Sequence, residues 1–246
     1  MIGKQAKVGS VSIFSFHLAE TTVAAAAGVL LRPPSRESVR GLHKAECLTV
    51  MKLGSPIFSA GRMQLKRNAV FAAWESEDAL NEFLRDTPLG RTLSLGWHVR
   101  LELIRRWGRF SGFDEIPPST EPLPDDAPVV AVTLARLKLS QLPRFIRWGK
   151  PAEQLVRDHP GATLALAALR PPGTFSTFSV WRSQTEMINM VRGKDDTPGA
   201  DRHAAAMKER NRKDFHHEFT TLRFRALSEH GTWEGRRDIV PTSGAH

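Results

Sequence analysis

Imidazole side chains are the groups in this sequence best suited to chemistry. The nine histidines are His17, His43, His98, His159, His203, His216, His217, His230 and His246. Neutral imidazole binds transition metals and haem iron, and it transfers protons near neutral pH. The short motifs of nucleophile elbows, phosphate-binding loops, dinucleotide sites and zinc proteases are absent from the sequence. Any chemistry must therefore come from side chains that the fold brings together.

His203 has the most suggestive sequence context of these histidines. It opens the stretch His203-Ala-Ala-Ala-Met207, where we expect a helix whose small residues let a flat group approach the backbone. Such a histidine could be an axial ligand of haem iron, and Arg192 and Lys208 could pair with haem propionates. The alternative is an ordinary solvent-facing helix, and residue type alone favours that alternative.

The remaining candidates are weaker. His216 and His217 are adjacent, so in extended chain they would point to opposite faces and chelate poorly. His17 and His98 lie in predicted strands and could point into a cavity, although a hydrogen-bonded core or surface position is favoured. Cys47 is the only cysteine, which excludes an intrachain disulfide and a cysteine-cluster metal site. We interpret it as a small core residue.

Two stretches of the chain repeat one another in the same order. Aligning Trp74 with Trp181 sets an offset of 107 residues. The further matches are Phe71 with Phe178, Ser76 with Ser183, Arg85 with Arg192, residues 86–88 with 196–198, and residues 108–112 with 231–235. Matches that keep their order indicate two copies of one unit rather than chance recurrence. We interpret both tryptophans as core residues, and we expect function where the copies differ. The His203 helix is one such place, because residues 91–95 stand there in the first copy.

Each copy reads as β-α-β-β-α-β, the ferredoxin-like order of an α+β fold. Predicted strands cover residues 11–17, 48–53, 69–74, 99–103, 129–139, 163–169, 175–181 and 219–227. Predicted helices cover residues 23–31, 77–85 and 202–215, and two more begin at the caps Ser140 and Ser183. We predict copies at residues 8–115 and 129–241, joined by a proline-rich linker at 116–128. The two sheets would pack into an α+β barrel, within the chain or by exchange in a homodimer, with an apolar ligand space between them.

Bulk composition is that of a soluble globular protein. The chain has 246 residues, of which 41% are hydrophobic and 25% charged, and its net charge is +9. The positive field attracts anions, but the basic residues are scattered and lack interleaved aromatic residues, which argues against nucleic-acid binding. The sequence shows neither a signal peptide nor an apolar run long enough for a membrane span, so we expect a cytoplasmic protein.

With these residues laid out, the chain resembles the spheroidene monooxygenase family, which modifies carotenoids. The similarity is strongest over residues 41–54, 66–74, 174–181 and 203–235, and it includes the ending Gly231-Thr-Trp-Glu-Gly235. The resemblance implies a monooxygenase that uses haem and molecular oxygen to introduce a keto group into an acyclic carotenoid. His203 stands where the family pattern has a histidine, which implies an iron ligand. The chain departs from the pattern at residues 214–218 and in the insertion at 193–201.

The resemblance also carries expectations about partners. It implies a hydrophobic small-molecule substrate, an unidentified electron donor, peripheral contact with a membrane surface and a homo-oligomer. The positive net charge would favour docking on anionic lipid. The alternative is a non-catalytic α+β barrel that binds haem or a hydrophobic small molecule.

Overall fold

The computed structural model describes residues 12–55, 59, 61–194 and 201–242, which form two successive β-α-β-β-α-α-β units. The strands are β1 Ile13–Glu20, β2 Leu42–Met51, β3 Met63–Trp74, β4 Trp97–Arg109, β5 Val129–Leu137, β6 Ala162–Arg170, β7 Thr174–Trp181 and β8 His216–His230. The helices are α1 Val23–Leu31, α2 Glu77–Asp86, α3 Pro88–Ser94, the 3-10 turn η1 Leu139–Gln141, α4 Leu142–Asp158, α5 Gln184–Arg192 and α6 Asp201–Arg212.

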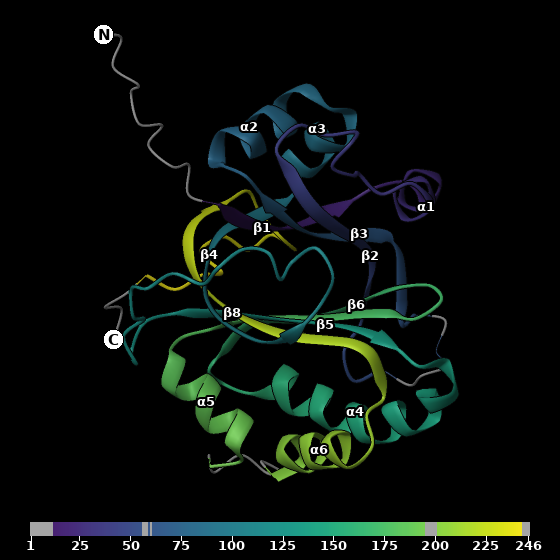
Figure 1. Cartoon of the computed structure of the whole chain (residues 1–246), viewed down its shortest axis with the longest axis vertical. Coiled ribbons are helices and arrows are strands. Elements are labelled where there is room, and N and C mark those ends of the chain that lie inside the picture. The colour runs from purple at the N-terminus through teal and green to yellow at the C-terminus, as the bar shows by residue number, and fades with distance from the viewer. Residues whose placement is uncertain (1–11, 56–58, 60, 195–200, 243–246) are drawn as a thin grey trace, which may run out of the picture.

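The strands close one antiparallel barrel within the single chain. Their order around the barrel is β1-β3-β2-β6-β7-β5-β8-β4. The halves join through β2 with β6 and through the long ladder of β4 with β8. Helices α1 to α3 lie on the side of the first half, and α4 to α6 lie on the side of the second half (Figure 1). The predicted tandem α+β barrel is confirmed, whereas the boundaries 8–115, 116–128 and 129–241 stay predictions.

Side chains from both halves fill the inside of the barrel. Inward positions of the strands form one buried apolar cluster, to which loop residues such as Phe113 and Ile239 contribute. Phe16 of β1 and Phe178 of β7 come from opposite walls, and their ring centroids lie only 3.8 Å apart. Rings packed this closely form a core as dense as a protein interior. The expectation of an open ligand space between the sheets is therefore wrong at this layer of the barrel.

The two tryptophans that define the repeat are core residues, as predicted. Trp74 and Trp181 are buried at equivalent ends of β3 and β7. The indole N–H of Trp74 donates to Ser15 Oγ at 2.8 Å, and that of Trp181 donates to Ser179 Oγ at 2.8 Å. A buried indole needs such an acceptor, so each copy supplies its own serine.

Helix starts follow the sequence signals in most cases. Ser76 caps α2 and Ser183 caps α5 by accepting backbone N–H groups at 3.2 Å and 3.1 Å. The prediction that Ser140 caps a helix is wrong, because Ser140 lies in the 3-10 turn and α4 begins after it without a side-chain cap. The first half also has a short helix, α3, at the place that α6 takes in the second half, so the His203 helix does have a counterpart.

Most strand cores were found, but several strands are longer than predicted. β2 begins at Leu42 rather than near residue 48, because His43, Lys44 and Glu46 interrupt the apolar pattern while the ladder with β3 continues. β8 likewise starts at His216 and runs to His230. Pairing with neighbouring strands decides strand length here, and pairing partners are not visible in local composition.

Candidate functional site

A row of large side chains crosses the helix-covered face of the first half. The strand registers place Cys47, Val70, His17, His98 and His230 side by side, one from each of five strands. The ring centroids of His17 and His98 lie 5.0 Å apart, and those of His98 and His230 lie 4.7 Å apart. The first four members of the row are buried. This face is closed by its own side chains and by the helices above it.

In the equivalent row of the second half, threonines stand at the positions of both buried imidazoles and Trp107 stands at that of His230. The registers align Ala167, Thr177, Thr133, Thr221 and Trp107 in the same way. Where the first half has a valine and two stacked imidazoles, the second half has three threonines. These three, called here the threonine face, remain partly exposed although α4, α5 and α6 lie on the same side of the sheet. The second half thus leaves accessible surface beneath its helical layer.

Helix α6, which carries His203, belongs to that layer. It packs against α4 and α5. Glu209 of α6 is paired with Arg144 of α4 and with Arg212 at 2.7 Å. Hydrogen bonds from Arg212 and Arg144 lower the pKa of Glu209 to about 2, and the contact with Arg144 links α6 to α4. The His203 side chain itself lies outside the described part of the structure, and its role as a ligand stays a prediction.

Three arginines gather beside the threonine face. Arg223 of β8 donates to Gln184 Oε1 at 2.8 Å and lies over the ring of Trp107 at 5.0 Å. Its Nε is buried and has no hydrogen-bond partner. Burial, with Arg105 and Arg192 nearby, lowers the pKa of Arg223. An anion placed beside these three positive charges would be attracted to them.

The predicted cofactor-binding arginine, Arg192, therefore belongs to a group that sequence reasoning missed. Arg192 is exposed at the end of α5 and lies close enough to Arg223 to lower its pKa. Lys208, the other predicted cofactor residue, is exposed on α6. Only the strand register puts Arg223 beside Ala131 of β5 and Arg105 of β4. The scattered basic residues of the sequence gave no signal for this grouping.

The two strand histidines, His17 and His98, do not point into the barrel. His17 and His98 lie on the outer, helix-covered face and not inside the barrel, so the expectation that they could face the barrel cavity is wrong. His17 is instead a hydrogen-bonded core histidine, the favoured interpretation of the sequence, since its Nε2 lies 2.9 Å from Ser15 Oγ. Burial lowers the pKa of His17 well below its ordinary value and that of His98 to about 4. Both rings are therefore neutral structural groups at neutral pH.

Two further sequence interpretations are confirmed. His216 is buried beside Asp214, with Nδ1 to Oδ1 at 2.9 Å, while His217 is exposed, so the adjacent pair does not chelate. Cys47 is buried, and burial raises the pKa of its thiol to about 12, as expected for an unreactive core residue. Among the described residues, His, Cys, Asp and Glu side chains do not form a cluster of three or more that could hold a metal ion.

Comparison with known proteins agrees with the resemblance seen in the sequence. The protein named spheroidene monooxygenase from Rubrivivax gelatinosus is 34% identical to this chain over 117 residues. The matched part is 47% of this chain and 42% of that protein, so less than half of the relative is spanned. A scan against protein-family models finds no match.

Solved structures with the same fold include two aldoxime dehydratases. One, in complex with butyraldoxime, has a TM-score of 0.56 at 9% identity, over 94% of this chain and 87% of that one. The other has a TM-score of 0.54 at 10% identity, over 97% of this chain and 91% of that one. At such low identities the likeness concerns the fold.

Among the described residues, no helix combines the length and the apolar character that crossing a membrane requires.

Proposed function

We propose that this protein is a haem-dependent monooxygenase that acts on a hydrophobic substrate of the carotenoid type. The similarity to spheroidene monooxygenase supports the reaction class. The observation that carries the cofactor assignment is the threonine face, because its three threonines stay partly exposed where the matching Val70, His17 and His98 of the first half are buried. The haem would lie between this face and helices α4, α5 and α6. It would not lie between the two sheets, where Phe16 and Phe178 are stacked.

The residues present fit such a group. His203 is the proposed iron ligand from α6, and the small residues around it allow close approach of a flat ring. Arg223 offers a buried donor without a partner, and Arg192 adds a second positive charge for the propionates. Lys208 is the proposed cation from α6. When bound, haem supplies a redox-active iron at which dioxygen is activated.

The chain's own residues would prepare the site for an apolar substrate. The hydroxyls of the threonine face can donate or accept one hydrogen bond each without adding charge. The helical layer would shield this space from water, which strengthens the remaining polar contacts. Electrons would come from a separate donor protein. The net charge of +9 would favour contact with an anionic membrane surface, where an apolar substrate resides.

Titration of the purified protein with haemin tests this proposal. We expect a Soret band in the wild type, a weaker band in His203→Ala, and no change in the control His217→Ala, whose ring is exposed on β8. The variant Thr177→Phe should also weaken the band, because a large ring would fill the threonine face. Absence of a band in the wild type, or equal bands in every variant, would refute haem binding at this place.

Reaction with oxygen separates an enzyme from a binding module. After reduction of the bound haem under anaerobic conditions, admission of oxygen should change the spectrum within the time of mixing. A reduced form that never reacts with oxygen would favour the alternative, a non-catalytic barrel that binds haem or a hydrophobic small molecule.

A further inference from the structure

A pocket that is separate from the threonine face opens at one mouth of the barrel. Its volume is about 600 Å³. It is lined by Arg136, Leu137, Leu139, Arg170, Pro171, Pro172, Gly173, Thr174 and His217. Arg136 follows Leu134 along the inward row of β5, and Arg170 follows Ala168 along that of β6. The pocket is thus the polar end of the packed barrel interior.

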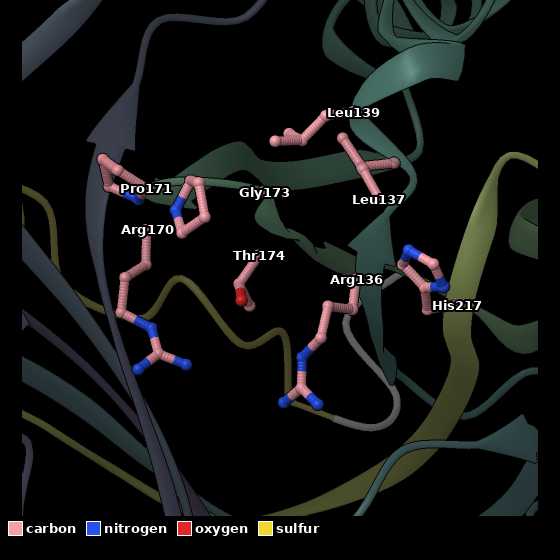
Figure 2. Close-up of a pocket in the computed structure, with 9 residues that line it drawn as sticks. Arg136, Leu137, Leu139, Arg170, Pro171, Gly173, Thr174 and His217 are labelled. Carbon is pink, nitrogen blue, oxygen red and sulfur yellow. The ribbon is translucent and has the colours of Figure 1, made fainter.

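Two arginines enter this pocket from β5 and β6, the two strands that flank β7. The side chains of Arg136 and Arg170 extend toward the same space, with the hydroxyl of Thr174 between them (Figure 2). Buried or half-buried carboxylates hold both guanidinium groups. Arg170 donates to Glu46, whose carboxylate also lies 4.0 Å from Arg136 Nη2, and Arg136 Nη1 lies 2.5 Å from Glu218 Oε2. These contacts fix the arginines before a ligand arrives, which lowers the entropy cost of binding.

The arginines still have donors to offer. A guanidinium carries several N–H groups in a planar fork, and the carboxylates described here use only part of them. Arg170 Nε is buried and has no hydrogen-bond partner. Below it, the hydroxyl of Ser176 is 1% exposed and also lacks a partner. Because these two atoms are covered by protein, an anion at this mouth would meet the exposed part of each guanidinium, since the Arg136 and Arg170 side chains are 39% and 23% exposed.

The internal repeat shows that this charge arrangement is particular to the second half. The register of β1 with β3 pairs Glu20 with Arg67, whose side chains form an ion pair at 2.8 Å. The equivalent register of β5 with β7 pairs Arg136 with Thr174. Arg136 thus stands where the first half has Glu20, and Thr174 stands where the first half has Arg67. The first half neutralises this position within the strand pair, whereas in the second half Arg136 is paired with Glu218 of β8, and Thr174 leaves a hydroxyl at the pocket.

The rim of the pocket is apolar. Leu139 is 55% exposed, and Pro171 and Pro172 are exposed beside it. A free inorganic anion would leave these side chains in water, whereas a molecule with an apolar body would cover them. We propose that this pocket binds a small organic carboxylate, with its oxygens on the exposed N–H groups of Arg136 and Arg170 that Glu46 and Glu218 leave free, and its apolar part against Leu139 and the two prolines. This inference does not rest on the proposed haem chemistry.

Calorimetric titration of the full chain with phenylacetate tests the assignment, and 2-phenylethanol serves as the uncharged comparison. We expect saturable binding of phenylacetate and none of the alcohol. Arg136→Gln should weaken phenylacetate binding about ten- to a hundredfold, as for loss of one charge-assisted hydrogen bond. Arg85→Gln is the charge-matched control, because Arg85 is exposed on α2 and paired with Asp86. The Arg85→Gln variant should bind phenylacetate with the affinity of the wild type.

A second variant keeps the test decisive if Arg136→Gln does not fold. Thr174→Val keeps the shape of the wall and removes the hydroxyl, and we expect about a tenfold loss of affinity. No heat from phenylacetate with the wild type would overturn the inference, as would equal affinity in Arg136→Gln or Thr174→Val and in Arg85→Gln. Inorganic phosphate that binds as tightly as phenylacetate would overturn the assignment of an organic ligand.

Discussion

Acidification should destabilise the protein through its buried histidine row. His98 and His17 are neutral in the folded state because burial lowers the pKa of each ring, and His98 also lies beside His230 and Arg100. In the unfolded chain the same rings bind protons near their ordinary pKa. The unfolded state therefore takes up more protons as the pH falls below 6.5, and the folding equilibrium shifts toward it. The stabilisation is complete above that pH and is lost as the pH falls toward the folded value of about 4.

The expected size follows from the shift of His98. A pKa that moves from 6.5 to about 4 changes the free energy of unfolding by about 2 kcal/mol between about pH 7.5 and about pH 5. This is an upper estimate, because some solvent reaches the outer end of the row, where His230 is exposed. His17 acts in the same direction. Glu77 and Glu229 face His230 and oppose part of its own shift, so His230 contributes less.

Urea denaturation at the two pH values measures this effect. His98→Gln keeps a polar side chain of similar size but cannot take up the proton, so its stability should fall by roughly 1 to 2 kcal/mol less on acidification than that of the wild type. His217→Gln serves as the control, because its exposed ring lies outside the row. An equal fall in the wild type and in His98→Gln would refute the assignment of acid sensitivity to the row.

Three further predictions concern single side chains. Ser183→Ala should lower the free energy of unfolding by about 1 kcal/mol through loss of the α5 cap, while Ser140→Ala should change it little; urea denaturation of both variants compares them. Cys47 should react with a thiol reagent only after unfolding, so a fast reaction in native buffer would contradict its burial. Glu46→Gln should bind phenylacetate more tightly than the wild type, because it removes a negative charge beside both arginines while the amide oxygen can still accept from Arg170; weaker binding by calorimetry would contradict the proposed pocket.

The sequence contained enough to predict the architecture. Trp74 and Trp181 marked the repeat, and the serine caps fixed the starts of α2 and α5. These signals are local, because a cap needs only the residues of its own turn. The same local reasoning failed at Ser140, where the chain forms a 3-10 turn before α4 begins. A serine before an apolar stripe permits a cap but does not require one.

The candidate sites could not be predicted in the same way, because they depend on register between strands distant in sequence. His17 and His98 are 81 positions apart, and only the pairing of β1 with β4 stacks their rings. Arg136 and Arg170 meet at the barrel mouth because β6 and β7 continue the sheet from β5. A shift of one residue in any of these ladders would turn the side chains to the other face. The composition of the sequence and the spacing of its residues do not reveal the register of these strands.

The two copies differ at matching positions of their helix-covered faces. A duplicated unit starts with two equivalent helix-covered faces, and each must be filled by side chains or by a ligand. In the first half, His17 and His98 stand where the second half has Thr133 and Thr221. The imidazoles fill their face and must stay neutral to do so. The threonines leave theirs partly exposed, at a cost in packing that a bound group in the second half would offset.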